Sequence, residues 1–190
     1  MRIIAGSAKG RTLSSVAGAT RPTSDRAREG LFSSLLSEFG DFVGLNFLDL
    51  FAGSGAIGLE ALSRGAQVVH AVEKDEAAMR TISTNFDLVT KSGPTGIFHA
   101  YSISAQKFLA GAAPAQYDIV YVDPPYDFSG VNLYECLAGL RAGNFLKSGS
   151  VVAVERAIRD EEIKWPSGYE PLRQRKYGQA MIYYGKVADS

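Results

Sequence analysis

The chain has 190 residues, of which 46% are hydrophobic and 21% charged, and its 20 basic and 20 acidic side chains give a net charge of zero. This composition excludes a disordered or fibrous chain, and the zero net charge gives no overall signature of nucleic-acid binding. No apolar run reaches the ~20 residues of a membrane helix and no secretory signal is recognised, so a cytoplasmic protein without a membrane partner is expected. One cysteine, Cys136, and two scattered histidines predict no disulfide and no metal site.

Residues 1–20 are predicted to form a small basic β-hairpin arm in front of one α/β domain over residues 21–190. Short apolar pieces alternate with Gly6 and Gly10, which favours a hairpin with glycine turns. The first 22 residues contain no acidic side chain and carry Arg2, Lys9, Arg11 and Arg21. Such a basic cluster fits a solvated surface, and it also fits a local phosphate-binding face.

A helix is predicted over residues 25–39, because Ser24 or Asp25 can cap it, apolar residues recur at helical spacing and Gly40 ends the pattern. Strands and helices alternate after this helix. The predicted strands cover 45–51, 67–72, 97–101, 117–122 and 151–155, and the predicted helices cover 56–64, 75–88, 104–109 and 131–141. This alternation indicates a mostly parallel sheet with helices on both faces.

The end of the chain departs from the alternation of strands and helices. Segments 170–176 and 180–184 flank Tyr177-Gly178-Gln179. Two strand-like segments around a glycine-containing turn predict a terminal antiparallel hairpin.

The end of the first predicted strand carries a glycine-rich loop. Gly53, Gly55 and Gly58 fit the pattern G-x-G-x-x-G. Glu73 ends the next strand, 20 residues after Gly53, at a spacing that suits a carboxylate bound to ribose hydroxyls. The glycine spacing alone is compatible with a dinucleotide, another nucleoside cofactor or a purely structural turn. Asp49 favours S-adenosylmethionine, because a carboxylate at the strand end repels a pyrophosphate and attracts an α-ammonium group.

The strand predicted over 117–122 runs into Asp123-Pro124-Pro125-Tyr126. The two prolines fix the backbone, so Asp123 is held at a strand end in a stiff loop. Its carboxylate and a backbone carbonyl, such as that of Pro124, would accept the two N–H bonds of an aromatic amine and turn the nitrogen lone pair towards a methyl donor. Tyr126 would stack on the base. We therefore predict an amine methyltransferase with this tetrapeptide as its catalytic loop, against the alternative of a proline-rich turn after a core strand.

Several segments are similar to those of one family, and together they cover nearly the whole chain: Met1–Gly6, Arg21–Phe32, Asp49–Ala66, Val72–Asp75 and Asp123–Tyr126. They resemble the ribosomal small-subunit methyltransferase D family, which methylates N2 of a guanine in 16S rRNA. The resemblance implies a Rossmann-like, seven-stranded methyltransferase fold and S-adenosylmethionine as the donor. It also implies that the basic arm contacts 16S rRNA in an assembled or partly assembled small ribosomal subunit. Nothing in the sequence demands more than a monomer.

The resemblance assigns roles to individual residues. The cofactor is expected to contact Asp49, Phe51, Ala52, Gly53, Ser54, Gly55, Glu73 and Lys74. The rRNA is expected to contact Arg2, Lys9, Arg11, Arg21, Thr23 and Arg26. Many relatives of this fold carry Asp or Asn after the third strand to bind the adenine amine, whereas Ser102 takes that place here. Thr23, Arg26 and Arg28 fit a helix cap with surface charge, and they fit equally a place beside the cofactor or the target base.

Three other functions remain open from the residues alone. A DNA adenine-N6 methyltransferase would use the same tetrapeptide, but it normally needs a target-recognition domain for which 190 residues leave little room. An NAD-dependent oxidoreductase is favoured only by the glycine spacing. A non-catalytic RNA-binding protein would use the basic arm alone. Guanine-N2 methylation of 16S rRNA is the leading hypothesis.

Overall fold

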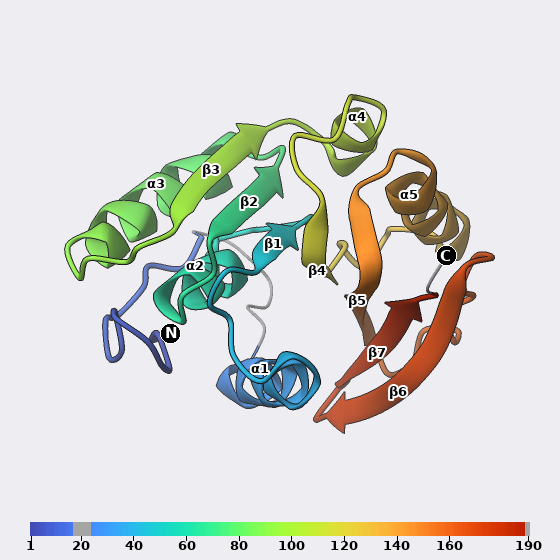
Figure 1. Ribbon diagram of the computed structural model, residues 1–190, viewed down its shortest axis with the longest axis horizontal. Coiled ribbons are helices and arrows are strands. Elements are labelled where there is room, and N and C mark those ends of the chain that lie inside the picture. Colours follow the sequence, from blue (N-terminus) through green and yellow to red (C-terminus); the bar gives the residue numbers. More distant parts are fainter. Residues whose placement is uncertain (17–23, 189–190) are drawn as a thin grey trace.

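The computed structural model describes residues 1–16 and 24–188, which form an α/β fold around one sheet. The strands of these residues are β1 (Asn46–Asp49), β2 (Val68–Glu73), β3 (Ile97–Ser102), β4 (Tyr117–Val122), β5 (Leu146–Ala157), β6 (Tyr169–Tyr177) and β7 (Ala180–Val187). Their order across the sheet is β3-β2-β1-β4-β5-β7-β6 (Figure 1). Strands β1 to β5 are parallel, and β7 is antiparallel to both of its neighbours. The predicted seven-stranded, mostly parallel sheet with a terminal hairpin is confirmed.

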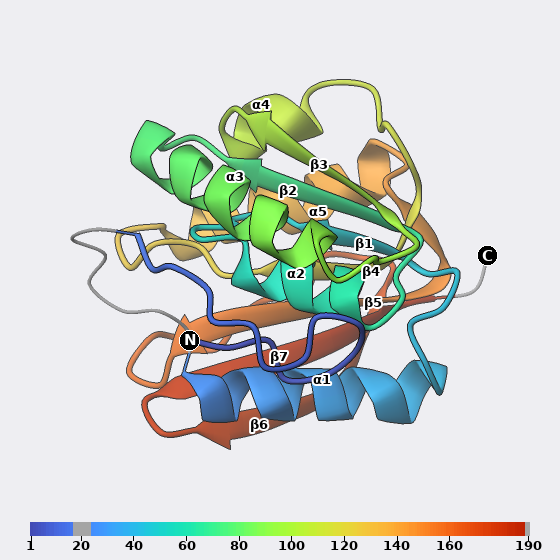
Figure 2. The ribbon, with the colours of Figure 1, turned by 90° about the vertical axis from the view of Figure 1, so that its left-hand side faces the viewer.

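Helices cover both faces of the sheet, as the alternation predicted. They are α1 (Asp25–Phe39), α2 (Ala56–Ser63), α3 (Glu76–Thr90), α4 (Ala105–Leu109) and α5 (Gly130–Ala142). The first three share an apolar core with one face of the sheet, and α4 and α5 share another with the opposite face (Figure 1). Helix α1 runs alongside the terminal hairpin (Figure 2), where Glu38 accepts hydrogen bonds from Arg173 and Lys186. No helix among the described residues is long and apolar enough to cross a membrane.

The central strands β1 and β4 consist mainly of apolar residues. Phe47 and Leu48 of β1 are fully buried, as are Ile119, Val120 and Val122 of β4. A strand covered by helices on both faces needs apolar side chains pointing in both directions, so its sequence does not alternate. Because β1 lies between β2 and β4, its carboxyl end is near the middle of the sheet edge.

Local side-chain chemistry sets the element boundaries. The hydroxyl of Ser24 accepts a hydrogen bond from the Ala27 amide at 3.1 Å and caps α1, and Gly40 ends the helix with a φ of 80°. Strand β5 begins at Leu146, earlier than predicted. Polar residues surround Gly149, whose φ is 71°, and the pairing of β5 with β4 is irregular in this region. The pattern of apolar residues therefore did not indicate the first part of β5.

The N-terminal segment folds back onto the domain. The predicted hairpin is present as a short antiparallel pairing without regular strands: Arg2 and Thr12 form a bridge, the Ile3 amide donates to the Arg11 carbonyl at 2.9 Å, and the Leu13 amide donates to the Met1 carbonyl at 2.8 Å. Ile3, Ala8 and Leu13 are buried in the core that α1 and α2 also form. The predicted boundary between residues 20 and 21 lies outside the described residues and stays a prediction.

Glu60 of α2 holds this N-terminal segment in place. The residue is fully buried, and its carboxylate accepts hydrogen bonds from the amides of Ile4 at 2.7 Å and Ala5 at 3.0 Å. It also accepts one from Arg64 Nε at 2.7 Å. A buried carboxylate with both oxygens engaged stabilises the structure, whereas its removal would leave buried donors without an acceptor.

We expect Glu60→Ala to lower the free energy of unfolding by about 3 kcal/mol, because two amides and the Arg64 guanidinium lose their acceptor. Urea denaturation measures this loss, and hydrogen exchange should quicken at Ile4 and Ala5. The matched control is Glu76→Ala on α3, where the carboxylate is 89% exposed and the change should stay within ~0.5 kcal/mol. A loss below about 1 kcal/mol for Glu60→Ala would contradict the anchoring role.

Candidate active site

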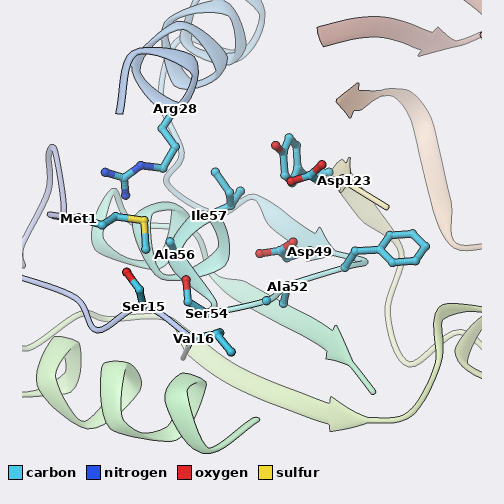
Figure 3. A pocket seen from close by; sticks show the side chains of 13 residues that line it. Met1, Ser15, Val16, Arg28, Asp49, Ala52, Ser54, Ala56, Ile57 and Asp123 are labelled. Carbon is cyan, nitrogen blue, oxygen red and sulfur yellow. The ribbon is translucent and has the colours of Figure 1, made fainter. Parts of the chain in front are cut away.

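Two carboxylates meet at the carboxyl edge of the sheet. Asp49 ends β1 and Asp123 directly follows β4, and these strands are adjacent and parallel, with Asp49 paired to Tyr121. The Leu50 amide donates to the Tyr121 carbonyl at 3.0 Å, which holds the chains together just past the end of β1. Both carboxylates line one cavity of about 200 Å³ (Figure 3). In an open α/β sheet, this edge is where ligands bind.

The glycine-rich loop between β1 and α2 borders this cavity. Gly53 and Gly55 have φ values of 54° and 76°, which favour glycine. A Cβ on Gly53 would meet no atom within 4 Å, so a ligand can approach the backbone here. Gly58 has a different role. Its amide donates to Asp49 Oδ2 at 3.1 Å, and a Cβ there would lie 3.1 Å from Val69 Cγ1, so this glycine lets α2 pack closely on the sheet.

Asp49 is a buried carboxylate with one unengaged oxygen. The residue is 1% exposed, and its Oδ1 has no hydrogen-bond partner. Burial raises the pKa of Asp49 to about 7, and the charge of Glu73 adds to this rise, while the Gly58 amide opposes it. A buried carboxylate oxygen of this kind is unfavourable by itself and suits a cationic group.

Glu73 ties the glycine-rich loop to the end of β2. Its Oε2 accepts a hydrogen bond from the Gly53 amide at 2.8 Å. Its Oε1 accepts hydrogen bonds from the amides of Lys74 at 2.8 Å and Asp75 at 2.9 Å. Glu73 therefore positions the loop, and together with Lys74 it lines a second cavity of about 460 Å³.

The second cavity adjoins the first. Phe51, Gly53 and Asp123 line both of them. The ring of Phe51 packs edge-on against Phe128, with 5.2 Å between the ring centroids, and forms an apolar wall. A ligand with a charged end and a flat apolar end would find a matching surface in each cavity.

Ser102 is at the exposed end of β3, where it pairs with Glu73, and it is not among the residues that line either cavity. Residues 103–106 line the second cavity instead. The hydroxyl of Ser104 accepts a hydrogen bond from the Lys107 amide at 3.2 Å and caps α4, so the chain turns towards the cavity only after Ser102. Ser104 is recognisable in the sequence as a helix cap. This signal would have placed the expected adenine contact at residues 103–106 in place of Ser102.

Asp123-Pro124-Pro125-Tyr126 leaves the sheet as an ordered turn. Pro124 is buried, whereas Pro125 is exposed. The Pro125 carbonyl accepts a hydrogen bond from the Phe128 amide at 2.9 Å, which closes the turn. Tyr126 is 54% exposed, so much of its ring is open to solvent close to Asp123 in the chain.

Part of the first cavity was not predicted from the sequence. Met1, Ser15 and Val16 of the N-terminal segment line it, together with Arg28 of α1 (Figure 3). The sequence left two places open for Arg28, a surface ion pair with Asp25 or a position beside the cofactor or target base, and the residue is fully buried beside this cavity. Ser15 and Val16 belong to no motif, and tertiary packing brings them to the glycine-rich loop.

The basic residues expected to contact RNA have different surroundings. Arg2, Lys9, Arg11 and Arg26 are exposed. Arg11 Nε donates to Ser92 Oγ at 3.2 Å, and Arg21 and Thr23 lie outside the described residues. Within residues 1–16 and 24–188, no three His, Cys, Asp or Glu side chains are grouped in a way that could hold a metal ion.

Comparisons with known proteins support the fold and identify the family. The family described as Conserved hypothetical protein 95 matches residues 1–186. The chain is 34% identical over 180 residues to ribosomal RNA small subunit methyltransferase D of Escherichia coli, over 94% of this chain and 86% of that protein. The chain belongs to the methyltransferase D family.

Solved structures share the fold of this chain. The structure of yhhF from Escherichia coli, described as a methyltransferase, has a TM-score of 0.85 and 31% identity, and the match covers 100% of this chain and 99% of that one. Magnesium protoporphyrin IX methyltransferase of Synechocystis, solved with bound S-adenosylmethionine, shares the fold at a TM-score of 0.63 and 14% identity, over 85% and 79% of the chains. The family-model match over residues 1–186 includes the N-terminal segment that lines the first cavity.

The raised pKa of Asp49 predicts that this buried carboxyl lowers stability at neutral and higher pH. The folded protein holds the proton more tightly than the unfolded chain, so the stabilising contribution is complete below the ordinary pKa of 3.8 and is lost as the pH rises through about 7. We expect Asp49→Asn to raise the free energy of unfolding by about 2–4 kcal/mol at about pH 8 and to change it little at about pH 4. Denaturant titrations at both pH values measure this, and an equal difference at each would contradict the assignment.

Proposed function

We propose that this protein transfers a methyl group from S-adenosylmethionine to the exocyclic N2 amine of a guanine in 16S rRNA. Membership of the methyltransferase D family supports methylation of rRNA. The observation that carries the proposal is that Asp49 ends β1, Asp123 follows the adjacent strand β4, and both line one cavity. The first carboxylate suits a cationic group, and the second suits the N–H of an aromatic amine.

The residues of the two cavities fit S-adenosylmethionine. The unpartnered Asp49 oxygen suits the α-ammonium group, and the open backbone at Gly53 permits close approach. The Glu73 carboxylate and the Phe51 wall of the second cavity suit a ribose and an adenine. The other proposed cofactor contacts are Ala52, Ser54, Gly55 and Lys74, and residues 103–106, which line the second cavity, take the place expected for Ser102. A dinucleotide fits less well, because its pyrophosphate would meet the Asp49 carboxylate.

When bound, S-adenosylmethionine supplies an electrophilic methyl group on a sulfonium centre. The Asp123 carboxylate accepts one N–H of the guanine amine, and the Pro124 carbonyl accepts the other. These two acceptors draw the nitrogen towards tetrahedral geometry, so its lone pair is less delocalised into the ring and is directed at the methyl group. The two prolines hold the acceptors in place, which reduces the reorganisation that the reaction needs.

The exposed Tyr126 ring stacks on the target guanine once that base has left its helix. Stacking of this kind contributes about 1–3 kcal/mol per base. The proposed RNA contacts are Arg2, Lys9, Arg11, Arg21, Thr23 and Arg26. They would bind phosphates of 16S rRNA in an assembled or partly assembled small subunit, with the protein acting as a monomer.

We expect Asp123→Asn to lower the rate of methyl transfer by about 10²–10³-fold, because the amide cannot offer a charged acceptor to the amine. The assay uses radiolabelled S-adenosylmethionine and small ribosomal subunits from cells that lack the gene. Digestion and mass spectrometry then identify the methylated nucleoside.

The matched control for this assay is Asp87→Asn, which changes an exposed aspartate on α3 and should leave the rate unchanged. Methylation that appears on adenine, or an Asp123→Asn variant as fast as the unmodified protein, would overturn the proposed function. The expected result is N2-methylguanosine formed at equal rates by the unmodified protein and Asp87→Asn, and much more slowly by Asp123→Asn.

A further inference from the structure

We propose that Arg28 binds the carboxylate of the methionyl part of S-adenosylmethionine, while Asp49 binds its ammonium group. The first cavity would then be a site for the two opposite charges of an α-amino acid. This inference rests on the proposed use of the methyl donor, and it adds a specific anchor from α1 that lies outside the glycine-rich loop.

The guanidinium of Arg28 is buried with unused hydrogen-bonding capacity. The residue is 0% exposed, and its Nη2 donates to the Arg2 carbonyl at 2.7 Å and to Asp25 Oδ1 at 2.8 Å. Its Nε and Nη1 are buried and have no hydrogen-bond partner. The Asp25 side chain is 62% exposed, so solvent screens this ion pair. A buried guanidinium with two unpaired nitrogens is unfavourable, and an anion that accepts hydrogen bonds from both would stabilise it.

Arg28 lies at the cavity in which the methionyl part of the cofactor is proposed to bind. Arg28 and Asp49 line the same cavity, on which the glycine-rich loop and the first turn of α2 also border (Figure 3). Asp49 contributes its own unpartnered oxygen, Oδ1. Cationic and anionic groups with free hydrogen-bonding capacity therefore share one cavity, which matches the carboxylate and ammonium of an amino acid.

The start of α2 adds to the attraction for a carboxylate. Its N-cap residue is Gly55, and no side chain caps the helix. Ala56 and Ile57, which begin the helix, line the cavity with Arg28. The first amides of a helix lack partners within the helix and carry a partial positive charge, so they favour an anion.

An RNA phosphate is a poorer occupant of this cavity than an amino acid. A phosphate brings only negative charge, whereas Asp49 and Asp123 line the same space. Met1, Ser15 and Val16 of the N-terminal segment also form part of the wall. The pairing of opposite charges thus favours the methionyl group over the RNA backbone.

Calorimetric titration of two ligands tests the role of Arg28. S-adenosylhomocysteine keeps the amino-acid group, and its decarboxylated analogue lacks only the carboxylate. We expect the unmodified protein to bind S-adenosylhomocysteine roughly 10- to 100-fold more tightly than the analogue. Arg28→Met should bring the ratio of the two affinities close to one, because only the binding of the carboxylate-bearing ligand is weakened. Arg28→Lys should keep an intermediate ratio because the charge remains.

The matched control is Asp25→Asn, which removes the ion-pair partner of Nη2 and leaves Nε and Nη1 unchanged. Its ratio should equal that of the unmodified protein. Circular dichroism checks the fold of each variant. If Arg28→Met does not fold, the ratio of the unmodified protein and its decrease in Arg28→Lys decide the question.

Three results would overturn the inference: a ratio near one in the unmodified protein, an unchanged ratio in folded Arg28 variants, or a loss of RNA affinity without a change in the ratio. The inference and the proposed function fail separately. Methylation of a base other than guanine, with the expected ratios, would overturn the proposed function alone. An unchanged ratio in the Arg28 variants, with N2-methylguanosine formed, would overturn this inference alone.

Discussion

The parallel pairing of β1 with β4 is the constraint on which the rest of the site depends. These strands are not consecutive in the chain, and the crossover places the residues that follow them side by side at the carboxyl edge of the sheet. Asp49 and Asp123 thereby border one cavity although they are distant in sequence. The glycine-rich loop extends from β1, and the proline turn extends from β4. A shift in this pairing would separate the proposed donor site from the proposed amine site, even if every residue were kept.

Buried charged side chains of the described residues differ in whether their polar atoms have partners. Glu60 has its oxygens engaged by backbone amides and Arg64, so it contributes to the stability of the fold. Asp49 and Arg28 both line the first cavity and keep buried polar atoms without partners, which is expected to lower stability until a ligand supplies the partners. Buried charged groups without partners are expected at binding sites. The free energy gained when a ligand supplies the hydrogen-bond partners then contributes to the free energy of binding. The same feature explains why stability and cofactor affinity should respond in opposite directions to Asp49→Asn.

Much of the fold and the acidic part of the site could be predicted from the sequence. Strands, helices and turns have strong local signals, and Asp49 and Asp123 stand next to recognisable motifs. The burial of Arg28 could not be predicted, because its spacing from Asp25 equally suits a surface pair. The packing of the N-terminal segment depends on Glu60, which looks like an ordinary helix residue. Ser102 was chosen by its position after a strand, but the turn into the cavity follows it.

In the proposed mechanism, the methyl donor and the target amine meet between the ends of β1 and β4. A crystal structure of the protein with S-adenosylmethionine would show whether they do. We expect the ammonium group beside Asp49, the ribose beside Glu73 and the sulfonium methyl group directed towards Asp123. A cofactor bound away from these cavities, or one whose methyl group is directed away from Asp123, would rule out the proposed mechanism.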